Sequence, residues 1–243
     1  MDIQKFESYL KIKHSYYSTP SLEALNYYVR RFMITVPFEN INVQNKIPIS
    51  IDIKDLYNKI VIQRRGGFCY ELNHLFATYL EHKGSHMSLY VNIEGTLYIT
   101  DVGFGDLPTS IIEIGSKTQF IPTYDKNGVY RAVWINDNQY ALQKLRQNKW
   151  MTLYEAHLKS QSIKDFEDKI SYNEHHPHSI FVRHLLITQP QSFGRATMTY
   201  HSLTLSNDSN DSTKHKYDVT TNNYKYFLKK YFNLNVSIIP FEQ

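Results

Sequence analysis

Residues 64–73 read Arg64-Arg65-Gly66-Gly67-Phe68-Cys69-Tyr70-Glu71-Leu72-Asn73 and place the only cysteine of the chain directly after two glycines. The sequence after Cys69 predicts a helix that begins there, with an apolar side formed by Leu72, Leu75, Phe76, Tyr79 and Leu80. The N–H groups and the positive dipole end at a helix start stabilise a thiolate and a developing oxyanion. Glycines before it let the backbone turn sharply and a substrate approach closely. The pattern therefore favours a reactive Cys69 over an inert buried cysteine.

A thiolate nucleophile needs a base, and a carboxylate that orients the base. His86 and Asp101 lie on two predicted strands that flank Glu94-Gly95. If these two residues form a hairpin turn, Ile93 pairs with Thr96, and His86 becomes a diagonal neighbour of Asp101 on one face. The cysteine, His86 and Asp101 are therefore the predicted catalytic residues.

Other histidines fit a site less well. The run His175-His176-Pro177-His178 offers three ligands within four residues, but no distant carboxylate or cysteine is marked out beside it. We interpret this run as a surface turn and predict no metal site. His74 lies five residues into the Cys69 helix, where we expect a structural role.

The order of the predicted elements is helices first and strands second. Helical spacing covers residues 1–35, 52–62 and 69–83, and residues 224–232 form a last short helix. Alternating patterns predict strands at residues 86–91, 96–102, 130–135, 140–145, 150–153 and 180–188. The polar stretch 206–216 is expected to be a loop. This segregation indicates an α+β protein.

The composition of the 243 residues is that of a globular protein, with 42% hydrophobic and 21% charged residues. The net charge of +4 is scattered, without the basic stripe or zinc-finger spacing of a nucleic-acid-binding protein. One cysteine fits a reducing compartment. The first residues lack the apolar core of a signal peptide, and no stretch is apolar enough to span a membrane. We therefore expect a cytoplasmic enzyme.

Three motifs resemble those of the arylamine N-acetyltransferases. The first is the run at 64–73, the second is Asp101-Val102-Gly103-Phe104-Gly105, and the third is Val36-Pro37-Phe38-Glu39-Asn40-Ile41. Weaker similarities lie at residues 150–154, 165–167 and 176–181. The likeness thus spans most of the chain, and it is strongest between residues 37 and 105.

The resemblance implies a fold of three parts around a cysteine-protease-like Cys-His-Asp site. These are a helical domain over residues 1–84, a β-barrel-like domain over 85–190 that carries His86 and Asp101, and a smaller α/β lid over 191–243. It also implies ping-pong transfer of an acetyl group from acetyl-CoA, through a Cys69 thioester, to an arylamine or hydrazine. Acetyl-CoA and the amine would be the only partners, and the oligomeric state stays open.

The resemblance also assigns roles to residues around the nucleophile. Glu39 and Arg65 match an ion pair beneath the nucleophile loop, for which a scaffold role is expected. Phe104 matches a residue that lines the acyl pocket. The residues expected to bind substrate or cofactor are Phe38, Phe68, Gly103, Phe104 and Gly105.

The chain departs from the family pattern between Cys69 and His86. The interval is 86 − 69 = 17 residues, whereas family members usually have a longer segment. A helix from Cys69 to Lys83 runs ~21 Å at about 1.5 Å per residue. Three further residues return at most ~11 Å, which leaves His86 about 10 Å away. Either the helix is much shorter than its pattern, or a segment is missing between Gly84 and Ser85.

Other functions are compatible with the same three residues. A thiol hydrolase or amidase would use water as the acceptor, and an amide synthase would close a larger product. A non-catalytic binding protein with a broken triad is the alternative from another class. A truly short connection before His86 would favour this last interpretation.

Overall fold

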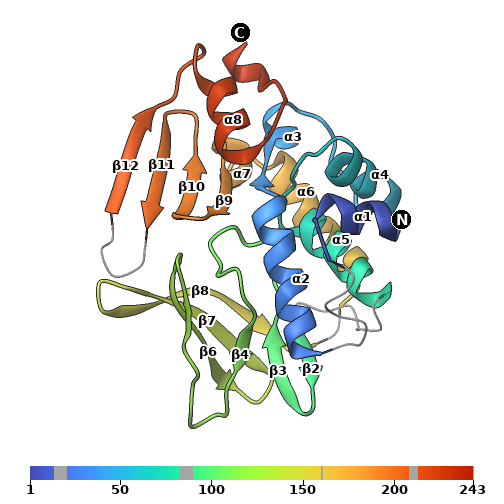
Figure 1. The fold of residues 1–243 in the computed structure, drawn as a ribbon, viewed down its shortest axis with the longest axis vertical. Coiled ribbons are helices and arrows are strands. Elements are labelled where there is room, and N and C mark those ends of the chain that lie inside the picture. Colours follow the sequence, from blue (N-terminus) through green and yellow to red (C-terminus); the bar gives the residue numbers. More distant parts are fainter. Residues whose placement is uncertain (14–20, 83–89, 160, 208–212, 243) are drawn as a thin grey trace.

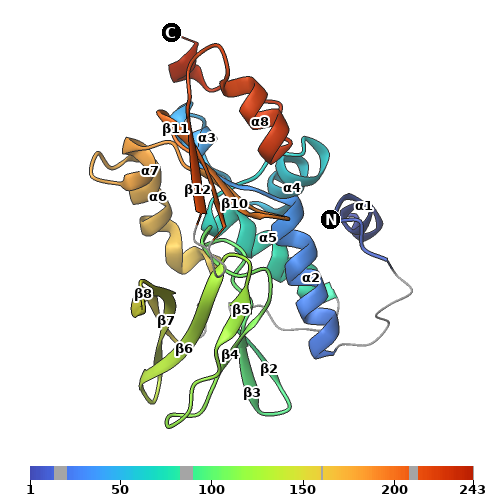
Figure 2. The same cartoon turned by 60° about the vertical axis from the view of Figure 1, so that its left-hand side comes forward.

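A computed structural model of the chain describes residues 1–13, 21–82, 90–159, 161–207 and 213–242 (Figure 1). Helices dominate the part before residue 83, and strands dominate the part that follows. The predicted α+β class is therefore confirmed. Two sheets lie one above the other, with α2 and α5 along one side (Figures 1 and 2).

Helices are present within each of the predicted ranges 1–35, 52–62, 69–83 and 224–232, and further helices that were not predicted lie elsewhere. Those before the strands are α1 (Ile3–Tyr9), α2 (Leu22–Thr35), α3 (Ile41–Gln44), α4 (Ile53–Tyr57), the π-helical turn η1 (Asn58–Ile62) and α5 (Cys69–His82). Those in the second half are η2 (Ile163–Phe166), α6 (Glu167–His175), α7 (Ile180–Arg183), α8 (Tyr224–Phe232) and η3 (Ile239–Phe241). The predicted helix start at Cys69 and the helix at 224–232 are confirmed. No described helix is long and apolar enough to cross a membrane.

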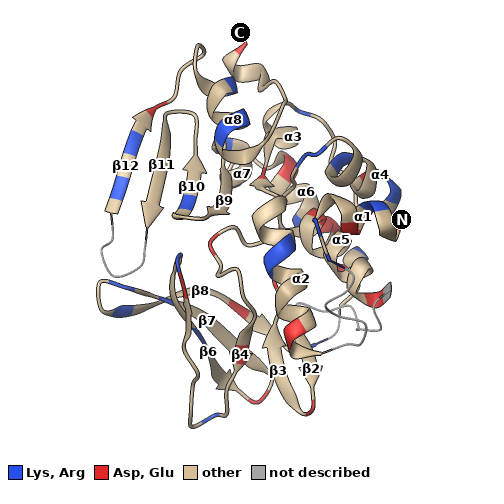
Figure 3. Ribbon diagram, viewed as in Figure 1, with Lys and Arg blue, Asp and Glu red and all other residues tan. Residues whose placement is uncertain are grey.

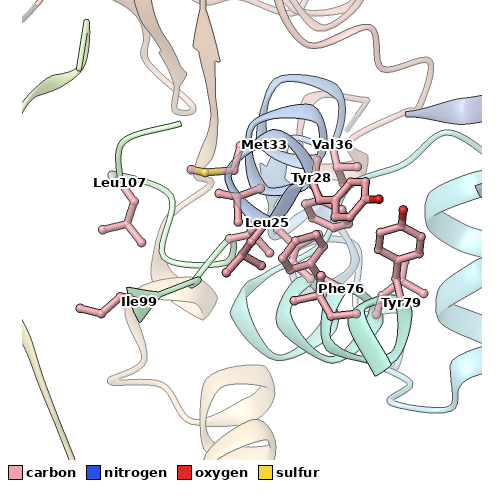
Figure 4. Packing of buried hydrophobic residues seen from close by; sticks show 14 of the residues in the cluster. Leu25, Tyr28, Met33, Val36, Phe76, Tyr79, Ile99 and Leu107 are labelled. Carbon is pink, nitrogen blue, oxygen red and sulfur yellow. The ribbon is translucent and has the colours of Figure 1, made fainter. Parts of the chain in front are cut away.

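The apolar side of α5 packs against α2 in the main core (Figure 4). Phe32 of α2 lies 5.0 Å from Phe76 of α5, ring centroid to centroid, and Tyr28 meets Tyr79 edge-on at 5.5 Å. These four side chains are at most 6% exposed. Burying a large apolar side chain contributes about 1.5–3 kcal/mol. This packing fixes α5, and with it the position of the nucleophile.

The larger sheet has seven strands and is open. Its order is β2-β3-β4-β6-β7-β8, and β5 pairs with β6. The strands are β2 (Tyr90–Ile93), β3 (Thr96–Ile99), β4 (Ile112–Ile114), β5 (Thr123–Asp125), β6 (Gly128–Asn136), β7 (Gln139–Arg146) and β8 (Lys149–His157). A barrel needs its first and last strands to pair, and β2 and β8 do not pair in the described residues. The prediction of a barrel-like domain is therefore wrong in that respect.

The β2–β3 hairpin has the predicted register, with Ile93 opposite Thr96. Glu94 and Gly95 both have positive φ, 52° and 86°, as a type I′ turn requires. Strand β3 ends at Ile99, three residues before the predicted end. The reason is that the Val102 N–H donates to the Asn73 side chain at 2.9 Å and not to a neighbouring strand.

The smaller sheet has five strands in the order β1-β9-β10-β11-β12. They are β1 (Phe38–Glu39), β9 (Ile187–Gln191), β10 (Gly194–Met198), β11 (Ser202–Asn207) and β12 (Thr213–Asp218). The first strand comes from the helical part of the chain, and it pairs with β9 through Phe38 opposite Thr188. The segment that precedes the nucleophile loop is thereby joined to the last part of the chain.

Two sequence predictions in this region are wrong. Residues 180–183 form α7, where a strand was expected, because the Ser179 side chain accepts from the Phe181 N–H and caps a helical turn. The expected loop over 206–216 contains the end of β11 and the start of β12. Every residue of β12 is exposed, so this edge strand lacks the apolar alternation by which a strand is predicted.

Candidate active site

Cys69 lies at the first position of α5, half-buried. Glu71 lies in the first turn of α5. Its carboxylate accepts a hydrogen bond from the Phe68 N–H at 3.0 Å and forms an ion pair with Lys59 at 2.7 Å. Burial and then the charge of Asp101 raise the pKa of the Cys69 thiol to about 12, although backbone N–H groups of Cys69 and Tyr70 act in the opposite direction. The helix start alone therefore does not ionise this thiol, and a nearby cation is required.

The glycine pair before Cys69 is required by packing. A Cβ at Gly66 would lie 2.0 Å from the carbonyl oxygen of Pro37, and one at Gly67 would lie 2.9 Å from the Glu71 carboxylate. Neither glycine has a positive φ, and the left-handed turn in this loop is made by Arg64, with φ 55°. The expected sharp turn at the glycines is therefore wrong, because what they permit is close contact with neighbouring chain.

Asp101 is 8% exposed and is held by two hydrogen bonds to one of its oxygens. Its Oδ1 accepts from Asn73 Nδ2 at 2.9 Å and from the Gly103 N–H at 2.8 Å. Burial raises the pKa of Asp101, and these hydrogen bonds offset part of that rise. Asn73 lies one helical turn after Cys69, so the carboxylate and the nucleophile are positioned by the same helix.

The second glycine motif lies directly on the nucleophile. A Cβ at Gly103 would lie 2.7 Å from the Cα of Cys69 and 2.8 Å from its carbonyl oxygen. Gly105 has φ 89°, a conformation that favours glycine. The predicted binding residue Gly103 thus lets this segment pass against the helix start, whereas Gly105 lies against Thr188 and Phe38.

Both sheets fix the residues that follow this motif. Arg195 of β10 donates to the carbonyl oxygens of Gly105 and Leu107, the latter at 2.7 Å. Asp106 accepts from Lys144 of β7 at 2.9 Å, and Lys144 is almost fully buried. The loop beside the nucleophile is therefore held from two directions.

Two tyrosines lie beside Asp101, and sequence analysis missed them. The charge of Asp101, after burial, raises the pKa of both Tyr140 and Tyr154. The ring of Tyr154 also lies 5.1 Å from that of Phe104, a predicted binding residue that is half-buried here. Sequence analysis also missed Asn73, whose spacing of four residues from Cys69 was the available signal.

Glu39 and Arg65 form the ion pair that the family resemblance implies. Glu39 Oε1 accepts from Arg65 Nη2 at 2.7 Å and from Nε at 3.0 Å, and Oε2 accepts from the Ile41 N–H at 2.7 Å. The Glu39 side chain is fully buried. Burial tends to raise the pKa of Glu39, but Arg65, Lys59 and the hydrogen bonds hold it below its usual value. This pair joins β1 to the nucleophile loop.

Phe38 and Phe68, both predicted to bind substrate or cofactor, are buried. Each ring lies 6.0 Å from that of Phe181 in α7. Phe68 also packs edge-on against Tyr70 at 5.4 Å, and Tyr70 lies 5.6 Å from Phe166. A row of aromatic rings therefore connects β1 with the start of α5 and with η2.

His86, the predicted base, lies outside the described residues, as does the Gly84–Ser85 junction. The described helix α5 runs to His82, so the explanation that this helix is much shorter than its pattern is wrong. His74 is half-buried, and burial lowers its pKa. His175, His176 and His178 are exposed at the end of α6. Within the described ranges, no cluster of three or more His, Cys, Asp or Glu side chains could hold a metal ion.

Comparison with known proteins places the chain in a family. The model of the N-acetyltransferase family matches residues 21–85 and 82–240, two segments that overlap at 82–85. The arylamine N-acetyltransferase of Escherichia coli (strain K12) is 30% identical over 190 residues, which cover 68% of this chain and 66% of that protein.

Solved structures show the same fold. The arylamine N-acetyltransferase from Mycobacterium abscessus matches with a TM-score of 0.86 at 17% identity, over 98% of this chain and 91% of that one. An arylamine N-acetyltransferase from Bacillus cereus, described as having a unique Cys-His-Glu catalytic triad, matches with a TM-score of 0.79 at 24% identity, over 95% and 97%. The family match covers most of the chain, and the chain therefore belongs to the arylamine N-acetyltransferases, a family of acyltransferases.

Proposed function

We infer that the protein transfers an acetyl group from acetyl-CoA to an arylamine or hydrazine by a ping-pong mechanism, with Cys69 as the nucleophile. The observation that carries this proposal is the contact of the Asp101-to-Gly105 segment with the first residue of α5. A carboxylate is thereby held next to a cysteine at a helix start, by Asn73 of the same helix. The cysteine and the carboxylate are two of the three members of a catalytic triad, in which a base lies between the nucleophile and the orienting carboxylate.

The base, as the third member of the triad, must supply a positive charge that stabilises the Cys69 thiolate. With burial and Asp101 raising its pKa to about 12, the thiol stays neutral near pH 7. An imidazolium beside it would favour the thiolate, and Asp101 would orient that ring and stabilise its charge. The proposed base is His86. Because α5 runs to His82, this proposal includes the second explanation given above, that a segment is missing between Gly84 and Ser85. An imidazolium would also help to keep Asp101 ionised, since burial raises the pKa of this carboxyl.

In the first half-reaction, the Cys69 thiolate attacks the carbonyl carbon of acetyl-CoA. The tetrahedral oxyanion collapses, the carbon–sulfur bond to CoA breaks, and the CoA thiolate takes the proton from His86. The backbone N–H groups at the start of α5 are donors for the oxyanion. The products are acetyl-Cys69, neutral His86 and free CoA.

In the second half-reaction, the amine nitrogen attacks the thioester carbon and His86 takes the proton that the nitrogen loses. The bond from carbon to Cys69 breaks, and the amide leaves with the thiolate–imidazolium pair restored. The half-buried Phe104 ring and the phenol of Tyr154 beside Asp101 supply an aromatic wall for a flat acceptor. Phe38, Phe68, Gly103 and Gly105 are proposed to shape the rest of this site.

The resemblance assigns the C-terminal residues 191–243 the role of a lid over this site, with domain boundaries at 84 and 190. Residues 191–243 are consistent with such a lid because Arg195 donates to the Gly105 carbonyl oxygen, and because β10 pairs with β9, which in turn pairs with β1. The single cysteine fits a reducing compartment, and we place the reaction in the cytoplasm.

Single-turnover acylation tests the proposal. The protein is mixed with acetyl-CoA in the absence of any amine, and intact-mass spectrometry with peptide mapping locates the acetyl group. One acetyl group on Cys69 and a stoichiometric burst of CoA are expected, with no acetylation of Cys69→Ser. No acylation by any acyl-CoA would leave a non-catalytic binding protein with a broken triad.

The acceptor is tested on the isolated acetyl-enzyme. Adding an arylamine such as 4-aminobenzoate or a hydrazine should discharge the thioester much faster than water does. Steady-state rates at several fixed acceptor concentrations should then give parallel double-reciprocal lines. Rapid hydrolysis that added amine does not outcompete would make the protein a thiol hydrolase.

A further inference from the structure

A basic groove of about 790 Å³ lies among residues that the acyl-transfer site does not use. It is formed by α1, the end of α2, η1 with the loop after it, β9 and the end of α8. Its lining side chains include five cations and one phenol, which are Lys5, Lys11, Arg31, Arg64, Lys230 and Tyr9. In Figure 3, cationic segments are visible on α2 and α8, two of the helices that form this groove. A groove of this size accommodates a nucleotide-sized molecule.

The charge of the basic groove is one-sided. Five of its lining residues are Lys or Arg, and none of those that the structure describes there is Asp or Glu. In the described parts of the chain these five cations form no salt bridge. Lys230 donates to the Tyr226 hydroxyl at 2.9 Å, which leaves its charge unneutralised.

The negative ends of the helix dipoles offset part of this positive charge. Most lining residues of α1, α2, η1 and α8 belong to the C-terminal turn of each element, and the exceptions are Lys5 and Arg31. Each helix C-terminus carries about −0.5 of an elementary charge, so four contribute about −2 against five cations. Arg31 illustrates the compensation, because its Nε donates to the Leu10 carbonyl at 2.7 Å. A surplus of about three positive charges remains without a counter-charge.

The backbone around the basic groove is held in an uncommon conformation. Lys11, Arg64 and Asn233 have φ values of 55°, 55° and 52°, and they are three of the seven non-glycine residues with positive φ in the described chain. All three line the basic groove. Each of the three follows a helix end, where a left-handed residue and a backbone hydrogen bond close the helix, as from the Leu234 N–H to the Leu228 carbonyl oxygen at 3.1 Å. The ends of these three helices are thereby fixed around the basic groove.

Arg64 and Arg65 are adjacent in the sequence, but their side chains lie in different parts of the structure. Arg65 is committed to Glu39 beneath the nucleophile loop. Arg64 is exposed in the basic groove. Burial raises the pKa of the Tyr9 phenol there to about 12, and the charge of Arg64 opposes that rise. The left-handed backbone at Arg64 separates the two side chains, so the groove cation is not required for the ion pair.

We propose that the basic groove binds a small molecule that carries a chain of two or more phosphate groups. Adjacent phosphates present several negative charges within a few ångströms, which matches the grouped cations of α1, α2, the η1 loop and α8. Arg31 and Arg64 supply planar guanidinium forks suited to phosphate oxygens. A single carboxylate would neutralise only one of the surplus charges. This site is additional to the acyl-transfer site and does not depend on that reaction.

Isothermal titration calorimetry with sodium tripolyphosphate tests the proposal. The unmodified protein should bind one equivalent, with an affinity that falls as salt rises. The double variant Arg64→Glu, Lys230→Glu should bind at least about tenfold more weakly, because two attractive charges become repulsive. The matched control Lys214→Glu, Lys216→Glu makes the same change of net charge on exposed β12 and should bind within about twofold of the unmodified protein.

Three results would overturn the proposal. They are no saturable binding by the unmodified protein, equal weakening in both double variants, or no weakening in the groove variant. If the charge-reversed groove variant does not fold, Arg64→Gln with Lys230→Gln removes the two charges with less repulsion, and the same loss is expected. Coenzyme A added to the tripolyphosphate complex separates two sources of phosphate. Displacement identifies the phosphates of the acyl donor, and independent binding identifies a separate ligand, while either result requires the anion site.

Discussion

The backbone of Gly103 lies directly against the backbone of Cys69, so close that a Cβ at Gly103 would be 2.7 Å from the Cα of Cys69. The contacting atoms belong to the first turn of α5, which the core beneath it holds in place. The nucleophile and the segment that carries Asp101 are therefore joined by main-chain packing, which no side-chain rearrangement can relieve.

We predict that Gly103→Ala abolishes acylation of Cys69 and lowers the free energy of unfolding by about 2 kcal/mol or more, as overpacking of a rigid site does. Burst amplitude and urea denaturation measure the two effects. Gly95→Ala is the control, since its Cβ would meet no atom within 4 Å and only the positive φ of 86° is unfavourable. It should cost about 1 kcal/mol and leave the burst intact. Full activity of Gly103→Ala would contradict the described packing.

Asn73→Ala should lower kcat and leave the fold intact. The change removes a donor to Asp101 and the acceptor of the Val102 N–H, at a cost of about 1–3 kcal/mol for groups left without a partner. Because Asn73 acts through Asp101, the pH at which activity rises should also shift. Asn26→Ala is the matched control. Asn26 on α2 also accepts a hydrogen bond from a backbone N–H, that of Ile111, at 3.1 Å. Equal loss of stability without a change in the pH profile in both variants would reduce Asn73 to a structural residue.

The reactivity of Cys69 should depend on His86. In His86→Ala the thiol keeps the pKa of about 12 that burial and Asp101 impose. The thiolate fraction at pH 7 is then about one in 100,000 and rises tenfold with each pH unit. Alkylation by iodoacetamide should follow that slope in His86→Ala, whereas the unmodified protein and His74→Ala should react rapidly near pH 7. The assignment of the base is wrong if His86→Ala reacts like the unmodified protein.

Glu39→Gln should lower the free energy of unfolding by about 3–5 kcal/mol, because Arg65 loses its buried partner. The folded protein holds the pKa of Glu39 below its unfolded value. This stabilisation is therefore complete above the unfolded pKa of about 4.3, and it is lost as pH falls through the lower folded pKa. The difference between Glu39→Gln and the unmodified protein should thus shrink in acid. Asp137→Asn, in the exposed pair with Lys117, should leave the unfolding midpoint unchanged at every pH.

The sequence predicts the local features of the site because local interactions produce them. The helix start at Cys69 follows from apolar spacing over the next eleven residues, and the register of the β2–β3 hairpin follows from Glu94-Gly95. The family motifs added the Glu39–Arg65 pair, which the structure contains. The helix at 224–232 was likewise predictable from its apolar face.

Other features could not be predicted, because they depend on contacts between distant parts of the chain. The β1–β9 pairing joins Phe38 to Thr188, and no pattern in either segment indicates the other. The exposed edge strand β12 contains no apolar face, and α7 is made by one capping serine within an apolar run. The open edges of the larger sheet depend on which strands meet, which a strand pattern does not state.

By itself, the sequence determined the α+β class, the family and the position of the nucleophile at a helix start, because periodicity, turn residues and motifs are properties of neighbouring residues. Tertiary structure alone decided why the glycines are needed, with Gly66 against Pro37 and Gly103 against Cys69. It also decided that Asn73 holds Asp101, and that helices and loops from four parts of the chain bring five cations into one groove. These relationships arise only when packing brings distant residues to within a few ångströms, where sterics and charge act.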